Sequence, residues 1–174
     1  MKRSPALTAL LGFAVTVLGG TLLHFLYGWL GGSLLVAPIC AVNESTWEHM
    51  KLLFVPSLLF GIPLARLYPS RTDLPCILLR AILVGLVLIP VLFYTYNGAV
   101  SPSPDWLNVA FFFLAAAGAY LTEYRLLKSD TPVCRAPGRA RLALLALALA
   151  FLLFTFLPPP LAIFRDPITS AYGI

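Results

Sequence analysis

The sequence predicts an all-α integral membrane protein, a bundle of five transmembrane helices with its N-terminus inside the cell and its C-terminus outside. Of its 174 residues, 60% are hydrophobic and 11% are charged, whereas a soluble domain is about half apolar and about a quarter charged. Five apolar stretches reach the roughly 20 residues that a helix needs to cross about 30 Å of hydrocarbon. Lysine and arginine are also divided unevenly between the ends of these stretches, which sets the orientation.

The five helices are expected at residues 5–30, 45–67, 74–96, 105–127 and 141–157, followed by a tail at 158–174. The first stretch exceeds the roughly 7 to 15 apolar residues of a signal peptide and no small-residue cleavage site follows it, so we expect it to remain as a helix. The fifth ends at three consecutive prolines, which lack the N–H that continues a helix. Strands are excluded, because open sheet edges cannot be satisfied in lipid. We therefore expect one integral membrane domain, residues 1–174, in a lipid bilayer.

The composition of individual helices predicts how they pack. The Gly19-Gly20 pair in the first helix and the small residues 115–119 in the fourth favour close contact between helices. Arg80, about two turns into the third helix, and Glu123, about one turn before the end of the fourth, lie at similar depth. A charge at that depth requires a partner, so we expect these two side chains to form a structural ion pair.

Ten of the twelve Lys and Arg residues fall at one end of the predicted helices. Cytoplasmic segments are enriched in these residues, so this end is predicted to be cytoplasmic. The ten are Lys2, Arg3, Arg66, Arg71, Arg80, Arg125, Lys128, Arg135, Arg139 and Arg141. Because they mark helix ends and do not form a face with interleaved aromatic residues, a nucleic-acid partner is not expected.

Other function classes lack support in the sequence. There is no G-x-S-x-G elbow, P-loop or dinucleotide-binding fingerprint. The three cysteines, Cys40, Cys76 and Cys134, are too few and odd in number for a disulfide framework, and no CxxC spacing indicates zinc.

The most polar segment of the predicted outer side is residues 43–51, where the second helix begins. Ser45 followed by Glu48 fits a capping box. Only 14 uncharged residues separate Lys51 from Arg66, about 21 Å of helix against about 30 Å of hydrocarbon. The charged turn must therefore reach inward, which predicts a polar pocket in the outer half of the membrane.

Three functions fit this pocket, and the sequence leaves open whether the protein is an enzyme. The first is binding of a small polar ligand or lipid head group through Asn43, Glu44, Trp47, Lys51 and Asp166. The second is a metal-dependent, membrane-embedded hydrolase acting on a lipid, with Glu48 or His49 as catalytic base and His24 and His49 holding a divalent metal. The third is a structural or accessory subunit, alone or in an oligomer.

The tail is apolar and aromatic, so we expect it to fold back over the outer mouth of the bundle rather than to be disordered. Asp166 before Pro167 suits a turn. Arg165 is then expected to meet Glu44 or Glu48.

Two segments resemble a family of small bacterial multi-pass membrane proteins classed as a domain of unknown function. One is residues 43–51, Asn-Glu-Ser-x-Trp-Glu-His-x-Lys. The other lies in residues 154–174 and combines paired prolines with Asp166-Pro167 and Tyr172-Gly173. The resemblance covers essentially the whole chain and implies a bacterial plasma membrane protein, but it brings no established activity. Relatives often carry histidine after the paired prolines; here Pro160 stands there, which argues against a metal ligand at that position.

Overall fold

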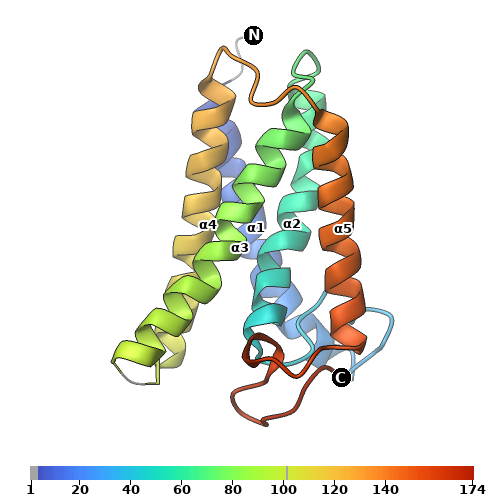
Figure 1. The fold of residues 1–174 in the computed structure, drawn as a ribbon, viewed down its shortest axis with the longest axis vertical. Coiled ribbons are helices and arrows are strands. Elements are labelled where there is room, and N and C mark those ends of the chain that lie inside the picture. The colour runs from blue at the N-terminus through green and yellow to red at the C-terminus, as the bar shows by residue number, and fades with distance from the viewer. Residues whose placement is uncertain (1–3, 101) are drawn as a thin grey trace.

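The computed structural model describes residues 4–100 and 102–174. Within them the chain forms five α-helices that run up and down one long axis (Figure 1). These are α1 (Pro5–Trp29), α2 (Thr46–Leu67), α3 (Leu74–Ala99), α4 (Asp105–Lys128) and α5 (Pro137–Phe156), with a short 3₁₀ turn, η1 (Ala162–Phe164), in the tail. All five α-helices are long and apolar enough to cross a membrane. The predicted all-α class and the five membrane-spanning helices are confirmed.

Two helix boundaries differ from those predicted. α5 begins at Pro137, four residues before the expected start at residue 141. Proline suits the first turn of a helix, because an N–H group there has no hydrogen-bond partner within the helix. α3 continues to Ala99, three residues beyond residue 96. Pro90 inside α3 does not end it, since neighbouring helices in a bundle can satisfy the freed backbone groups.

The helices pack closely through small residues, as predicted for α1 and α4. Ala115 and Ala116 are fully buried. A Cβ atom at Gly20 would lie 2.7 Å from the backbone oxygen of Leu52, so α1 and α2 approach to a distance that only glycine allows. A buried hydroxyl network adds hydrogen bonds to this packing: Thr16 Oγ1 lies 2.6 Å from the hydroxyl of Tyr120 and 3.2 Å from Oγ of Ser57. It joins α1, α2 and α4 within the membrane-spanning part.

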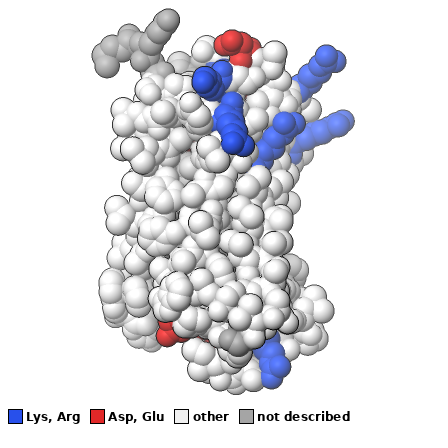
Figure 2. All heavy atoms as spheres, turned by 90° about the vertical axis from the view of Figure 1, so that its left-hand side faces the viewer, with Lys and Arg blue, Asp and Glu red and all other residues white. Residues whose placement is uncertain are grey.

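The start of α1 and the C-terminal tail lie at opposite ends of the bundle (Figure 1). We call the end with the start of α1, the α2–α3 turn and the α4–α5 loop the arginine-rich end, and the other the C-terminal end. Figure 2 shows Lys and Arg gathered at the arginine-rich end, above a broad uncharged surface. Lys2 and Arg3, two of the ten predicted there, lie outside the described residues. The assignment of this end to the cytoplasm stays a prediction.

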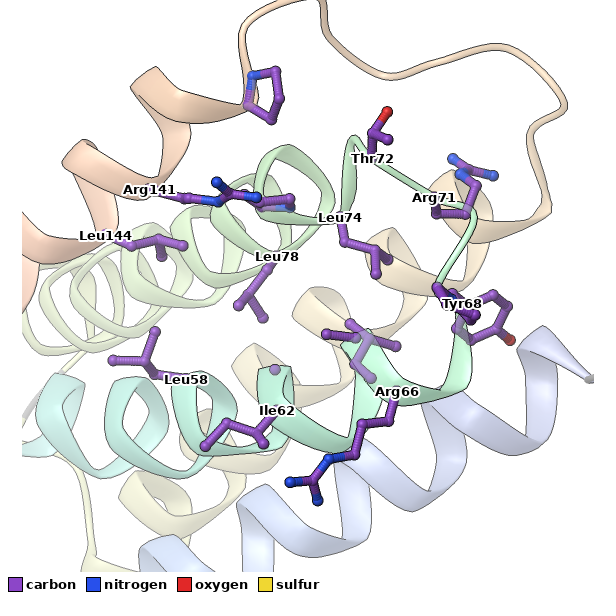
Figure 3. A pocket seen from close by; sticks show the side chains of 16 residues that line it. Leu58, Ile62, Arg66, Tyr68, Arg71, Thr72, Leu74, Leu78, Arg141 and Leu144 are labelled. Atoms are coloured by element: carbon purple, nitrogen blue, oxygen red, sulfur yellow. The ribbon is translucent and has the colours of Figure 1, made fainter.

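Polar contacts at the arginine-rich end hold the α2–α3 turn to the α4–α5 loop. The Arg71 guanidinium (Figure 3) binds both carboxylate oxygens of Asp73 at 2.9 and 3.1 Å and also donates to backbone carbonyls of residues 126, 127 and 129. The hydrogen bonds from Arg71 lower the pKa of Asp73. Asp73 also accepts a hydrogen bond from the backbone N–H of Val133.

A disulfide between Cys76 and Cys134 joins the first turn of α3 to the α4–α5 loop. The cysteine count argued against a disulfide framework and did not predict this pair, because 58 residues separate the two and only the packing of the helices brings them together. The third cysteine, Cys40, is buried.

The predicted ion pair between Arg80 and Glu123 was also wrong. Arg80 is exposed, and its guanidinium donates to the backbone carbonyl of Val133 at 3.0 Å. Glu123 is 1% exposed, and its Oε1 has no hydrogen-bond partner among the described residues. The two side chains lie at a similar level but on faces of their helices that do not bring them together.

Candidate metal centre

The start of α2 is fixed by capping contacts from the preceding loop. Ser45 is the N-cap, and its Oγ accepts a hydrogen bond from the N–H of Glu48. Asn43 Oδ1 accepts from the N–H of Ser45 at 2.9 Å, whereas the Glu48 carboxylate accepts from the N–H of Val42 at 3.0 Å. The predicted capping box is therefore half present, because Asn43 replaces Glu48 as the acceptor for Ser45. Together these bonds fix Glu44, which lies between Asn43 and Ser45.

Glu48 and Lys51 form an ion pair inside the bundle, with Nζ 2.7 Å from Oε2 and side chains only 2% and 0% exposed. Lys51 also donates to the carbonyl of Ala37 at 2.9 Å and to Oγ1 of Thr155 at 2.7 Å. Thr155 Oγ1 lies 3.2 Å from the other carboxylate oxygen of Glu48. The pair joins α2, α5 and the α1–α2 loop, and its hydrogen-bonding groups are occupied. Neither residue is placed to meet a ligand from outside.

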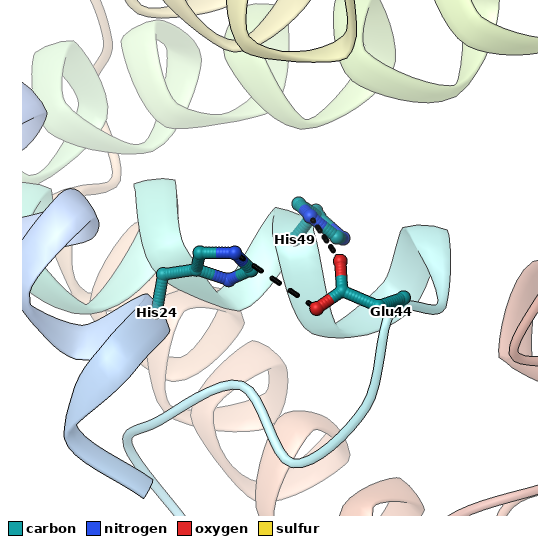
Figure 4. A group of neighbouring side chains, drawn as sticks. All are labelled: His24, Glu44 and His49. Atoms are coloured by element: carbon teal, nitrogen blue, oxygen red, sulfur yellow. Dashed lines mark ion pairs between the residues drawn. The ribbon is translucent and has the colours of Figure 1, made fainter. Parts of the chain in front are cut away.

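Three other side chains of the C-terminal end come together at the surface: His24 from the last turns of α1, Glu44 from the α1–α2 loop and His49 from the first turn of α2 (Figure 4). Glu44 Oε2 lies 3.5 Å from Nε2 of His49, and Oε1 lies 3.9 Å from Nε2 of His24. One ligand atom from each residue lies within 4.8 Å of the others. The Glu44 side chain is 42% exposed, so solvent reaches the cluster.

The hydrogen bond between His49 and the backbone of Ser45 shows which ring nitrogen carries the hydrogen and which one is left as an acceptor. Its Nδ1 lies 3.0 Å from the carbonyl oxygen of Ser45, which only accepts, so Nδ1 carries the hydrogen. In a neutral ring Nε2 is then a lone-pair acceptor aimed at the carboxylate of Glu44. Two acceptors 3.5 Å apart repel each other, and a metal ion shared by them would make the contact favourable.

The cluster has the donor set of a zinc site. Zinc is bound by histidine nitrogen and carboxylate oxygen at about 2.0–2.2 Å in tetrahedral geometry, which places ligand atoms about 3.3–3.5 Å apart. The 3.5 Å between Glu44 Oε2 and His49 Nε2 fits, whereas the three ligand atoms lie within 4.8 Å of one another, so His24 would have to move closer to share an ion with the other two. The contact between His49 Nδ1 and the Ser45 carbonyl is the kind of outer hydrogen bond that orients metal-binding histidines.

The sequence had named His24 and His49 as metal ligands, and the structure brings them together with ring centroids 5.4 Å apart. The sequence assigned Glu44 to the ligand contacts, not to the metal, because its position relative to the histidines depends on how the α1–α2 loop folds. The Nδ1 atom of His24 is buried and has no hydrogen-bond partner in the described part of the chain.

The tail folds back over the C-terminal end, as predicted. Asn43 Nδ2 donates to the carbonyl of Gly173 at 2.9 Å. Asp166 accepts from the N–H groups of Ile168, Thr169 and Glu44. Burial alone raises the pKa of Asp166, but these hydrogen bonds outweigh it and hold the pKa below its usual value. Asn43 and Asp166, predicted ligand contacts, thus link the tail to the loop that carries Glu44.

Two further predicted contacts have other partners. Trp47 packs its ring against Phe151, Phe164 and Phe154, with centroids 4.5, 4.8 and 5.6 Å away. It joins α5 to the tail. Arg165 forms no ion pair with Glu44 or Glu48 among the described residues, so that expectation was wrong. Its backbone instead pairs with that of Tyr172 in an antiparallel bridge within the tail.

Comparison with known proteins gives one match: the sequence model described as "Family of unknown function (DUF6512)" matches residues 2–174. No curated protein and no solved structure matches the chain. The match spans nearly the full length, and it confirms the resemblance to a family of unknown function.

Proposed function

The chain belongs to the DUF6512 family of unknown function, and on that premise we propose that it is a membrane protein that binds a divalent transition metal ion through His24, Glu44 and His49. The proposal rests on the geometry of these three side chains. They come from two helices and the loop between them, so a bound ion also ties α1 to α2 at the C-terminal end of the bundle.

The single observation that carries the proposal is the contact between His49 and Glu44. With Nδ1 of His49 hydrogen-bonded to the Ser45 carbonyl, a neutral ring aims a lone pair at the carboxylate. A metal ion shared by both groups turns this contact into a favourable one. His24 adds a second imidazole close to the same carboxylate. Imidazole and carboxylate together favour zinc over magnesium or calcium, which prefer oxygen ligands.

Three protein ligands leave one position of a tetrahedral zinc ion open. Because the Glu44 side chain is 42% exposed, a small polar ligand or a lipid head group bearing an oxygen donor could reach an ion held there. In this proposal the ligand predicted for this region binds to the metal ion. Glu48 and Lys51 support it indirectly by fixing the start of α2.

A second candidate function, hydrolysis of a lipid or other polar substrate, uses the same open position. Two histidines and one carboxylate with a water in the fourth position are the ligand set of several hydrolytic zinc enzymes, in which the bound water has a pKa near 7. In this reading His24, Glu44 and His49 would hold the metal, and the metal would supply an activated water as the nucleophile. Glu48 is not the general base, because both of its oxygens are occupied inside the bundle.

Elemental analysis of the purified protein tests the metal-binding proposal. The protein is purified in detergent, supplied with Zn²⁺, dialysed against metal-free buffer and measured by inductively coupled plasma mass spectrometry. We expect about one zinc ion per chain, lost in His24→Ala and His49→Ala and retained in Asp105→Asn, which changes another carboxylate at the C-terminal end. Absence of stoichiometric zinc, or its retention in the double histidine variant, contradicts the proposal.

A further inference from the structure

A cavity of about 740 Å³ opens at the arginine-rich end, between α2, α3 and α5. It lies at the opposite end of the bundle from the candidate metal centre. Figure 3 shows the side chains around it: leucines from all three helices face the hollow, and arginines lie toward its mouth. Its volume falls in the range of about 300–1,000 Å³ that is typical of small-molecule sites.

The inner surface of the cavity is apolar. Leu74 and Leu78 from α3, Leu58 from α2 and Leu144 from α5 line it. Gly61 also lines it and lies so close to α3 that an added Cβ would be 2.7 Å from Cδ2 of Leu78. These leucines offer a surface for hydrocarbon and no polar partner for a free ion.

The mouth of the cavity is positively charged. Arg66, Arg71 and Arg141 line it, and the described lining contains no Asp or Glu. The charge of Arg71 is balanced by Asp73. In Figure 3 the Arg141 side chain extends over the hollow, whereas the Arg66 side chain points to the far side of α2, away from the hollow. Arg141 is exposed and lies near the start of α5, the level at which lipid phosphates sit.

We propose that this cavity binds one anionic glycerophospholipid from the surrounding bilayer. An acyl chain lies on the leucines, and the phosphate accepts hydrogen bonds from Arg141. Arginine is suited to this role because its planar guanidinium matches two phosphate oxygens at once. Basic pockets between transmembrane helices recognise anionic lipid head groups in the same way. Ile62 lines the cavity and is 55% exposed, so the cavity opens to the surroundings at this residue and an acyl chain can enter there from the bilayer.

The two parts of the cavity predict separable effects. Arg141 selects the head group and contributes about fivefold in preference for an anionic over a zwitterionic lipid. The leucine-lined hollow holds the acyl chain whatever the head group. Removing Arg141 therefore lowers selectivity, whereas filling the hollow lowers the amount of lipid retained.

Native mass spectrometry of the full chain tests the proposal. The protein is reconstituted with equal amounts of phosphatidylglycerol and phosphatidylcholine, released into detergent, and the retained lipids are counted. We expect one phosphatidylglycerol per chain, about fivefold lower preference for it in Arg141→Gln, and no change in Arg139→Gln, an exposed arginine of α5 that does not line the cavity. Ala65→Phe, which places a ring at the cavity, is expected to reduce retention of both lipids.

Three results overturn the proposal. One is equal retention of the two lipids by the unaltered protein. Another is a loss of preference in Arg139→Gln as large as that in Arg141→Gln, which indicates general attraction to a basic surface. The third is displacement of the lipid by millimolar inorganic phosphate with no effect of Ala65→Phe, which indicates a site for a free anion.

Discussion

Glu44 Oε2 lies 3.5 Å from Nε2 of His49, while Nδ1 of the same ring is 3.0 Å from the carbonyl of Ser45. The two contacts use both nitrogens of one imidazole and give them opposite roles. Because Ser45 is also the N-cap of α2, the local fold of the helix start orients the ring.

The first prediction concerns Glu44. Replacing it by glutamine removes the anionic oxygen from the cluster and leaves the two histidines in place. We expect zinc affinity to fall by more than the roughly tenfold to hundredfold that loss of an outer hydrogen-bonding partner causes, with no loss of thermal stability in the metal-free protein, because the Glu44 side chain is partly exposed. Competition with a chromophoric chelator measures the affinity. An unchanged affinity would show that Glu44 is not a ligand.

The second prediction concerns the ion pair inside the bundle. Lys51→Met leaves the carboxylate of Glu48 buried without its cation, and Glu48→Gln leaves the ammonium of Lys51 without its anion. Each is expected to cost about 3–5 kcal/mol of unfolding free energy, and the double variant less than the two losses added. Unfolding in increasing fractions of denaturing detergent measures this. The exposed Lys128→Met serves as control, and equal effects at Lys51 and Lys128 would contradict a structural role for the pair.

The third prediction is an acid-induced release of the tail. The folded-state pKa of Asp166 is lowered, so its contribution is present above its usual value near 4 and is lost as the pH falls through the lower folded value. The tail packs Phe164 on Trp47. With Trp29 and Trp106 replaced by phenylalanine, the emission of Trp47 should therefore shift to longer wavelength at acidic pH. In Asp166→Asn the shift should already be present at neutral pH; a pH response identical to that of the unaltered residue would contradict the assignment.

The fourth prediction concerns orientation. In a background with all three native cysteines replaced by alanine, Arg135→Cys reports on the arginine-rich end and Ile168→Cys on the tail. If the arginine-rich end is cytoplasmic, a membrane-impermeant thiol reagent added to intact cells labels Ile168→Cys and not Arg135→Cys. Labelling of Arg135→Cys alone reverses the orientation. The native Cys40 is unsuited to this test because it is buried.

The Cys76–Cys134 disulfide bears on the same question. Disulfides persist in oxidising compartments and are rare in the cytosol. A cytoplasmic location of the arginine-rich end predicts that these thiols are reduced in cells and pair only after purification. Thiol trapping in acid-quenched cells distinguishes the two states. A disulfide present at the moment of quenching would favour the opposite orientation.

The fold could be predicted from the sequence because membrane-spanning helices follow from local apolar length. Most helix boundaries fall within one residue of those expected, and the early start at Pro137 reflects a preference of proline that composition alone does not reveal. The pairing of Cys76 with Cys134 depends on contacts across 58 residues, and no local spacing encodes it.

The candidate site was predicted in part. Adjacent residues in a helix point about 100° apart, so Glu48 and His49 have different surroundings: Glu48 meets Lys51 in the interior and His49 meets Glu44 at the surface. The sequence placed both residues in one polar segment and did not indicate that one is buried and the other lies at the surface. The contacts of Arg80 and Arg165 also differ from those predicted. A long side chain bonds to nearby backbone or lies along the surface when the carboxylate expected as its partner faces another way.

The central claim is that His24, Glu44 and His49 share one metal ion. X-ray absorption at the zinc edge, on protein loaded with one equivalent of Zn²⁺, tests it directly. The account predicts a tetrahedral first shell with two imidazole nitrogens and light oxygen ligands at about 2.0–2.2 Å, and loss of one imidazole in His24→Ala and in His49→Ala. A spectrum of hydrated zinc, or one unchanged by these substitutions, would contradict it.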